Sequence, residues 1–179
     1  GFSKPYCYHI DQFESLRPVF MQVMKYARAM GLDMIQGDHE DAPGQLELNW
    51  MYDDVLRNAD RLSTYRQICA QVAREFNLIA CFMTKPFMGV SASGCHTNMS
   101  LWTGGKDKVN KLSHKSIPAM DEVFTYVEGG KNTFMPDTKD VQLPGKVGLK
   151  AIGGVMKHLG ALTAIGSSTV NSYRRLWDT

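Results

Sequence analysis

The chain has 179 residues, of which 44% are hydrophobic and 21% charged, and its formal net charge is +2. This composition is ordinary for a globular protein, and the length predicts one domain with a sizeable core. No basic run interleaved with aromatic residues supports a nucleic-acid partner, and the longest apolar run, near residues 78–83, is far shorter than the roughly 20 residues that a bilayer requires.

The N-terminal part of the chain predicts one long helix followed by a short strand. Asp11 is a candidate N-cap with Glu14 three residues later, and apolar residues then recur at helical spacing until Gly31. Pro18 falls within this pattern, so the helix is expected to begin later or to bend there. A strand is predicted at residues 32–36.

Two further strands and a second long helix are predicted in the middle of the chain. In residues 45–51 polar and apolar side chains alternate, which indicates a half-buried strand with Glu47 on its polar face. Residues 53–76 carry an apolar stripe at helical spacing, and residues 78–83 form a continuous apolar run typical of a buried strand.

A strand predicted at residues 95–102 presents His96 on its polar face. A sheet that carries His96 and Glu47 inward, with Glu40 on the adjoining loop, would present two carboxylates and an imidazole to one cavity. Carboxylate oxygens suit hard divalent cations that also hold phosphates, and one imidazole extends the choice to manganese. The pattern therefore indicates a metal site, the alternative being solvated carboxylates with no ligand.

The C-terminal part predicts a surface excursion and then a helix. Residues 103–148 are polar and interrupted by glycine and proline, with a short helix predicted at residues 116–127. The last long helix is predicted at residues 147–164 and is ended by Gly166. Its inward side chains are expected to be Leu149, Ile152, Val155, Met156, Leu159 and Leu162.

The cysteines and the first residues bear on the compartment. The four cysteines show no CxxC pairing, and Cys69 and Cys81 lie in apolar contexts, so buried reduced thiols are expected. No apolar core follows the first five residues, as a secretory signal would require. A cytoplasmic location is expected.

Ordered segments along almost the whole chain resemble those of glutamine synthetases. The segment from Glu40 through Pro43-Gly44-Gln45 to Glu47 resembles the family's "HxE…PGQxE". The other matching segments are Ala59-Asp60-Arg61, Phe82-Met83-x-Lys85-Pro86-Phe87, Ser93-Gly94-x-His96-x-x-Met99-Ser100-Leu101, Gly153-Gly154-x-x-Lys157-His158 and Thr169-Val170-Asn171-Ser172-Tyr173-Arg174-Arg175-Leu176.

This resemblance implies an α+β fold with a curved, largely antiparallel sheet backed by long helices. Residues 1–179 would form the central part of the catalytic domain. The family's N-terminal β-grasp-like domain and the C-terminal part of its catalytic domain would be absent. The family assembles as homo-oligomeric rings with active sites between subunits, so this chain is expected to be inactive alone.

The resemblance also implies an activity: ATP-dependent ligation of ammonia or a small amine to the γ-carboxylate of glutamate, through γ-glutamyl phosphate, with two or more Mg²⁺ or Mn²⁺ ions. Glu40 and Glu47 would ligate one metal and His96 another, Glu40 would also hold or deprotonate the incoming amine, and Arg175 would clamp the glutamate carboxylate. The remaining implied positions are Asn98 and Ser100 for ATP, and Ala92, Gly94 and Tyr6 for the substrates.

Several positions depart from the family pattern. Asn98 replaces the second histidine of "HxH", and Ala92 replaces a glycine of the "NGSG" loop. These changes keep a second hypothesis open, in which the protein is a catalytically inactive relative that binds nucleotide or glutamate. The residues around Glu40 and Trp50 are closer to the relatives that form γ-glutamylamides. An ATP:guanidino phosphotransferase shares the broad fold class, but its cysteine motif is absent.

Overall fold

The computed structural model describes residues 7–104, 106–113, 121–128, 130–136 and 144–177 of the chain. Helices and antiparallel strand pairs follow one another along these residues, which confirms the predicted α+β class. The described strands form three separate two-stranded antiparallel sheets.

Helix α1 spans Ile10–Ala29 and supplies one side of the core. Its buried residues Phe20, Val23, Met24 and Ala27 recur every three or four positions, as one face of a helix requires. The predicted capping box is wrong: the N-cap is His9, whose side chain makes no capping bond, and Glu14 instead forms an ion pair with Arg17 at 2.9 Å.

The end of α1 at Gly31 is confirmed. Gly31 has a φ of 79°, and its N–H donates to the Arg28 carbonyl while the Leu32 N–H donates to the Ala27 carbonyl. This is the Schellman arrangement, in which a left-handed residue lets the chain reverse and satisfy the last free carbonyls. It turns the chain directly into the first strand.

Strands β1 (Met34–His39) and β2 (Leu46–Trp50) form an antiparallel hairpin close to the predicted positions. The register places Asp38 opposite Glu47 and His39 opposite Leu46. Side chains of Leu46, Leu48 and Trp50 pack on the core, so the alternation predicted for β2 is confirmed. The turn between the strands contains Gly44, which has a φ of 75°.

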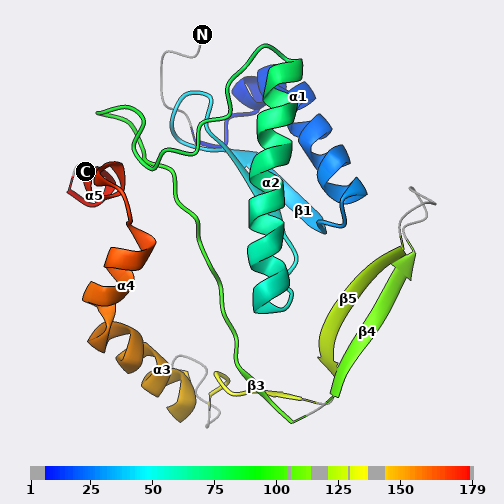
Figure 1. The fold of residues 1–179 in the computed structure, drawn as a ribbon, viewed down its shortest axis with the longest axis vertical. Coiled ribbons are helices and arrows are strands. Elements are labelled where there is room, and N and C mark those ends of the chain that lie inside the picture. The colour runs from blue at the N-terminus through cyan, green and yellow to red at the C-terminus, as the bar shows by residue number, and fades with distance from the viewer. Residues whose placement is uncertain (1–6, 105, 114–120, 129, 137–143, 178–179) are drawn as a thin grey trace.

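Helix α2 spans Val55–Glu75 and closes the core over the hairpin. Asp54 caps it, because the Asp54 carboxylate accepts hydrogen bonds from the backbone N–H groups of Leu56 and Arg57. Its buried Ile68 and Val72 meet the apolar face of α1, and Tyr65 packs on Trp50 with ring centroids 5.3 Å apart. In Figure 1, α1 and α2 lie side by side against β1.

The strand predicted at residues 78–83 is wrong. This segment has no strand pairing among the described residues, and Ile79 is 92% exposed. Cys81 is exposed as well, against the prediction. The Phe82 ring packs against Tyr65 and lies 4.9 Å below the Arg66 guanidinium. A continuous apolar run indicates burial on two sides, and here contact with α2 supplies one side.

The strand predicted at residues 95–102 is also wrong, apart from its last residue. Of residues 95–102, Trp102 alone belongs to a strand. This strand is β3 (Trp102–Thr103), which pairs with β6 (Lys131–Asn132). His96 therefore lies in an extended segment rather than on a strand, and no described sheet carries both His96 and Glu47.

Strands β4 (Lys106–Ser113) and β5 (Asp121–Glu128) form an antiparallel hairpin. The helix predicted at residues 116–127 is wrong where the structure describes it. The segment Val123-Phe124-Thr125-Tyr126-Val127 is β-branched or aromatic throughout, a composition that favours a strand over a helix.

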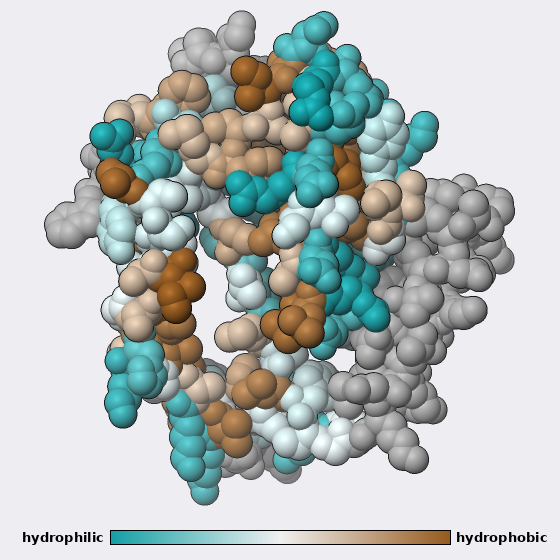
Figure 2. Space-filling view, viewed as in Figure 1, coloured by the Kyte–Doolittle hydropathy of each residue, from teal (hydrophilic) through white to brown (hydrophobic). Residues whose placement is uncertain are grey.

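The predicted helix at residues 147–164 is two helices, α3 (Lys146–Lys157) and α4 (Leu159–Gly166), which meet at His158. Helix α5 (Val170–Trp177) follows after the break predicted at Gly166. The side chains expected to point inward are exposed, from Leu162 at 44% to Met156 at 70%. Figure 1 shows α3, α4 and α5 in a line apart from α2, and apolar surface lies along this line in Figure 2.

None of the helices in the described ranges combines the length and the apolarity needed to cross a membrane.

Candidate functional site

Two carboxyl groups lie together at the tip of the β1–β2 hairpin. Glu40 directly follows β1, and its N–H donates to the Gln45 carbonyl at 2.8 Å, which closes the turn. Glu47 lies in β2, opposite Asp38. Partial burial and then the negative charge of Glu47 raise the pKa of the Glu40 carboxyl. Two acids this close favour a proton or a cation between them.

Tyr8 lies beside this pair and was missed from the sequence. Its backbone N–H donates to the His39 carbonyl at 2.9 Å, one residue before Glu40. A hydrogen bond with Cys7, and then the charge of Glu40, raise the pKa of the Tyr8 phenol. The predicted substrate residue Tyr6 lies outside the described residues. In the sequence, Tyr8 is marked only by being a second tyrosine, two positions after Tyr6.

The loop formed by residues 84–94 is attached to the carboxylate hairpin. The Gln45 side-chain amide donates to the Ala92 carbonyl and to the Ser93 hydroxyl, each at 3.2 Å, while its oxygen accepts the Ala42 N–H at 3.1 Å. The Ser91 hydroxyl donates to the Asp41 carboxylate. The structure thus brings the predicted Ala92 against the turn that carries Glu40 and Glu47, through its backbone.

The same loop is attached on its other side to α5. Asn171, in the first turn of α5, contacts Thr84 and Lys85 through its side-chain amide. Thr84 accepts the Ser93 N–H on its carbonyl at 2.8 Å, which closes the base of the loop. The loop therefore joins the carboxylate hairpin to the C-terminal helix, two parts of the chain far apart in sequence.

Gly94, His96 and Arg175 meet at the end of this loop. A Cβ placed on Gly94 would lie 3.2 Å from His96 Nε2 and 3.3 Å from Arg175 Nη2. A side chain at position 94 would crowd both nitrogen groups, so glycine favours their close approach to the backbone. An imidazole and a guanidinium that converge on bare backbone form a place where an anion can be held.

The other predicted residues are more loosely placed. Asn98 and Ser100 lie in the exposed extended segment before β3, where the Ser100 hydroxyl accepts the Trp102 indole N–H at 3.0 Å. Within the described ranges, no three His, Cys, Asp or Glu side chains are arranged to hold one metal ion. Glu40 and Glu47 are together, whereas His96 lies with Gly94 and Arg175.

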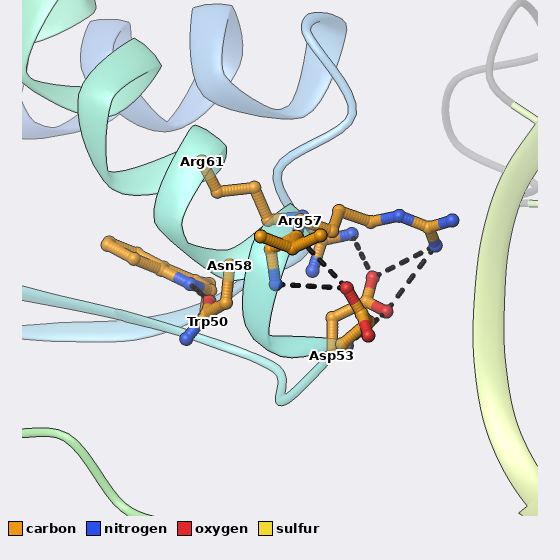
Figure 3. Close-up of polar contacts among 7 residues, drawn as sticks. Trp50, Asp53, Arg57, Asn58 and Arg61 are labelled. Atoms are coloured by element: carbon orange, nitrogen blue, oxygen red, sulfur yellow. Dashed lines mark hydrogen bonds and ion pairs between the residues drawn. The ribbon is translucent and has the colours of Figure 1, made fainter.

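A buried carboxylate with two arginine partners lies between the end of the hairpin and α2. The Asp53 carboxylate, whose side chain is inaccessible, lies 2.9 Å from Arg61 Nη2 and 3.2 Å from Arg57 Nη1 (Figure 3). Next to it, the Trp50 indole N–H donates to Asn58 Oδ1 at 2.6 Å. These contacts attach the end of β2 to the first turns of α2 and give Arg61 a structural role.

Cys69 is expected to react slowly with alkylating reagents. Burial raises the pKa of its thiol to about 11 from an ordinary 9.0, partly offset by a hydrogen bond with Tyr65. Because the thiolate is the nucleophile, this rise lowers the reactive thiolate fraction of Cys69 about a hundredfold at mildly alkaline pH. Mass spectrometry after iodoacetamide treatment should find the exposed Cys81 and Cys95 modified first. Modification of Cys69 in the folded chain at the rate of Cys81 would contradict this expectation.

Comparisons with known proteins bear on the family and the fold of the chain. The family model described as "Glutamine synthetase, catalytic domain" matches residues 2–179. A glutamine synthetase of Rhizobium leguminosarum bv. phaseoli is 35% identical over 95% of this chain, and a glutamate–methylamine ligase of Methyloversatilis universalis is 31% identical over 97%. In both cases the alignment covers 34% of the relative, so the chain spans about a third of the length of these curated proteins.

A solved structure, that of apo GmaS without ligand, has a similar fold. It superposes with a TM-score of 0.76 at 31% sequence identity. The superposition covers 98% of this chain and 35% of that one.

Proposed function

The chain belongs to the glutamine synthetase family, and we propose that it serves the ATP-dependent ligation of ammonia or a small amine to the γ-carboxylate of glutamate. The reaction would pass through γ-glutamyl phosphate, and assembly into homo-oligomeric rings belongs to the same proposal. The observation that carries it is the loop of residues 84–94, which joins a pair of adjacent carboxyl groups to a guanidinium and an imidazole.

The carboxyl pair fits a hard divalent cation. Partial burial, and then repulsion by Glu47, raise the pKa of Glu40, and a cation between the two carboxylates would relieve that repulsion. We assign Glu40 and Glu47 to one Mg²⁺ or Mn²⁺ ion and His96 to a second. When bound, such ions would neutralise the charge that develops on the transferred phosphoryl group.

The residues of this chain would hold the organic substrates. Arg175 presents a planar fork of donors that suits the carboxylate of glutamate, and its guanidinium lies beside Gly94. Ala92 lines the same loop, and Asn98 and Ser100 would contact ATP from the extended segment. Orientation of the reactants is the main contribution that such residues make to phosphoryl transfer.

Glu40 is also suited to the amine. Its raised pKa brings the carboxyl closer to the range in which it can accept a proton from an incoming ammonium or amine. Tyr8 lies beside Glu40, and Tyr6 is the residue that the family pattern assigns to the amine site. Similarity to a glutamate–methylamine ligase leaves both ammonia and a small amine as candidate nucleophiles.

A catalytically inactive relative that binds glutamate or nucleotide is the second candidate. It is favoured by Ala92, which replaces a flexible glycine, and by Asn98, which replaces an imidazole. ATP hydrolysis dependent on glutamate and amine, measured as phosphate release by the assembled protein, separates the two. Binding of nucleotide without phosphate release would support the inactive relative.

Replacing Glu47 with glutamine is expected to weaken Mn²⁺ binding by about tenfold or more. The change removes one of the two charged oxygen donors at the hairpin tip, and ligand charge largely sets the affinity for such ions. Calorimetric titration of Mn²⁺ into the chain, with and without ATP, measures the difference.

A Glu14→Gln variant is the matched control for this titration. Glu14 is an exposed acid on α1 whose partner is Arg17, so its loss should leave Mn²⁺ binding unchanged. Equal weakening in both variants, or no saturable binding by the unaltered chain, would overturn the assignment of the carboxyl pair.

A further inference from the structure

The Asn171 side chain forms three hydrogen bonds with the loop of residues 84–94. Its Oδ1 accepts the Thr84 hydroxyl at 3.0 Å and the Lys85 N–H at 2.8 Å, and its Nδ2 donates to the Lys85 carbonyl at 2.7 Å. Both the acceptor and the donor side of the amide are therefore used. The amide pairs with the N–H and the carbonyl of Lys85 together.

Asn171 and Arg175 lie on the same face of α5. They are four residues apart in one helix, and residues at this spacing lie one above the other. The start of the helix is fixed as well, because the Thr169 hydroxyl accepts the N–H of the buried Ser172 at 3.2 Å. Rotation of α5 that moved Arg175 would therefore break the contacts of Asn171.

The loop transmits this anchoring to the place where Arg175 ends. Asn171 holds the base of the loop at Thr84, and the Thr84 carbonyl accepts the N–H of Ser93. Ser93 immediately precedes Gly94, beside which the Arg175 guanidinium lies. Helix α5 thus binds one end of the loop through Asn171 and contacts the other end through Arg175.

We propose that Asn171 is a positioning residue that fixes the Arg175 guanidinium beside Gly94 and His96. It acts through α5 and the loop base and touches no reacting group itself. Its importance for catalysis rests on the proposed function, in which Arg175 binds the glutamate carboxylate. The positioning itself is a property of the chain and can be tested without a substrate.

The test is nuclear magnetic resonance of the chain labelled at arginine, glycine and histidine. In the unaltered chain, cross-relaxation is expected between the Gly94 α-protons and both the Arg175 side chain and the His96 ring. In Asn171→Ala the Gly94–Arg175 signal should be lost, while the signals of the α1–α2 core stay in place. A residue with a general structural role only would not remove this one contact selectively.

Two further variants keep the test decisive. Asn171→Asp retains the acceptor and loses the donation to the Lys85 carbonyl, so it should weaken the Gly94–Arg175 signal even if the alanine variant fails to fold. Asn132→Ala is the matched control, because Asn132 Oδ1 accepts the Phe134 N–H at 2.9 Å in a separate turn. The control should leave the signal unchanged.

The outcomes separate the two proposals. A Gly94–Arg175 signal that persists in both Asn171 variants, or is missing from the unaltered chain, overturns the positioning role. Loss of that signal in the variants supports the role, whatever the chain binds. If the signal behaves as expected but neither Mn²⁺ nor glutamate binds, the proposed function fails and the positioning role stands.

Discussion

Replacing Gly37 with alanine is expected to lower the free energy of unfolding by about 3 kcal/mol, the upper end of the usual cost of overfilling a core. A Cβ at this position would lie 2.1 Å from Phe20 Cε2 and 2.6 Å from the Glu47 carbonyl oxygen. The phenyl ring is buried in α1 and the carbonyl belongs to β2. Neither can withdraw without separating the hairpin from the helix.

Chemical denaturation followed by circular dichroism measures this effect. Gly154→Ala is the matched control, because Gly154 lies in α3 with nothing within 4 Å of the position of a Cβ. There alanine should be neutral or should stabilise by up to about 1 kcal/mol, the helix-propensity difference between the two residues. Equal unfolding midpoints for Gly37→Ala and the unaltered chain would show that β1 and α1 are not this close.

Replacing Asp53 with alanine is expected to cost about 3 to 5 kcal/mol of stability, as is usual when one partner of a buried ion pair is removed. The Asp53 carboxylate is inaccessible and bridges Arg57 and Arg61. The Arg61 side chain is 8% exposed, and its Nη1 already has no hydrogen-bond partner among the described residues. Without Asp53, the buried guanidinium would lose its compensating charge.

The companion variant Arg57→Ala separates charge burial from simple loss of a contact. The Arg57 side chain is 43% exposed, so water replaces much of what it loses, and a cost below about 1 kcal/mol is expected. Thermal unfolding of both variants gives the comparison. A cost for Asp53→Ala no greater than for Arg57→Ala would mean that the pair is solvated in solution.

Sequence patterns correctly predicted those parts of the fold whose signal lies within a single segment of the chain. The end of α1 at Gly31 and the alternation in β2 were recognisable because a left-handed glycine and a period of two follow from the chain itself. Residues 78–83, 95–102 and 116–127 were predicted incorrectly. An apolar run indicates that something should cover it, but it does not say which segment does so.

The candidate site divides in the same way. Family motifs pointed to Glu40, Glu47, His96 and Arg175, whose side chains have the expected chemistry. The motifs did not indicate that Gln45 and Asn171 connect them, because a hydrogen bond between residues more than forty positions apart depends on the fold. Tyr8 was missed for a related reason, since its place beside Glu40 follows from a backbone contact with His39.

The anchored loop of residues 84–94 has a consequence for affinity. Ordering the backbone of one residue costs about 1 to 2 kcal/mol of conformational entropy. Because Gln45, Asp41 and Asn171 already hold this loop, that cost is met when the chain folds rather than when a ligand arrives. Under the proposed function, preorganisation of this kind would leave more of the contact energy available for binding. Gln45 and Asn171 would then be determinants of affinity without either touching the ligand.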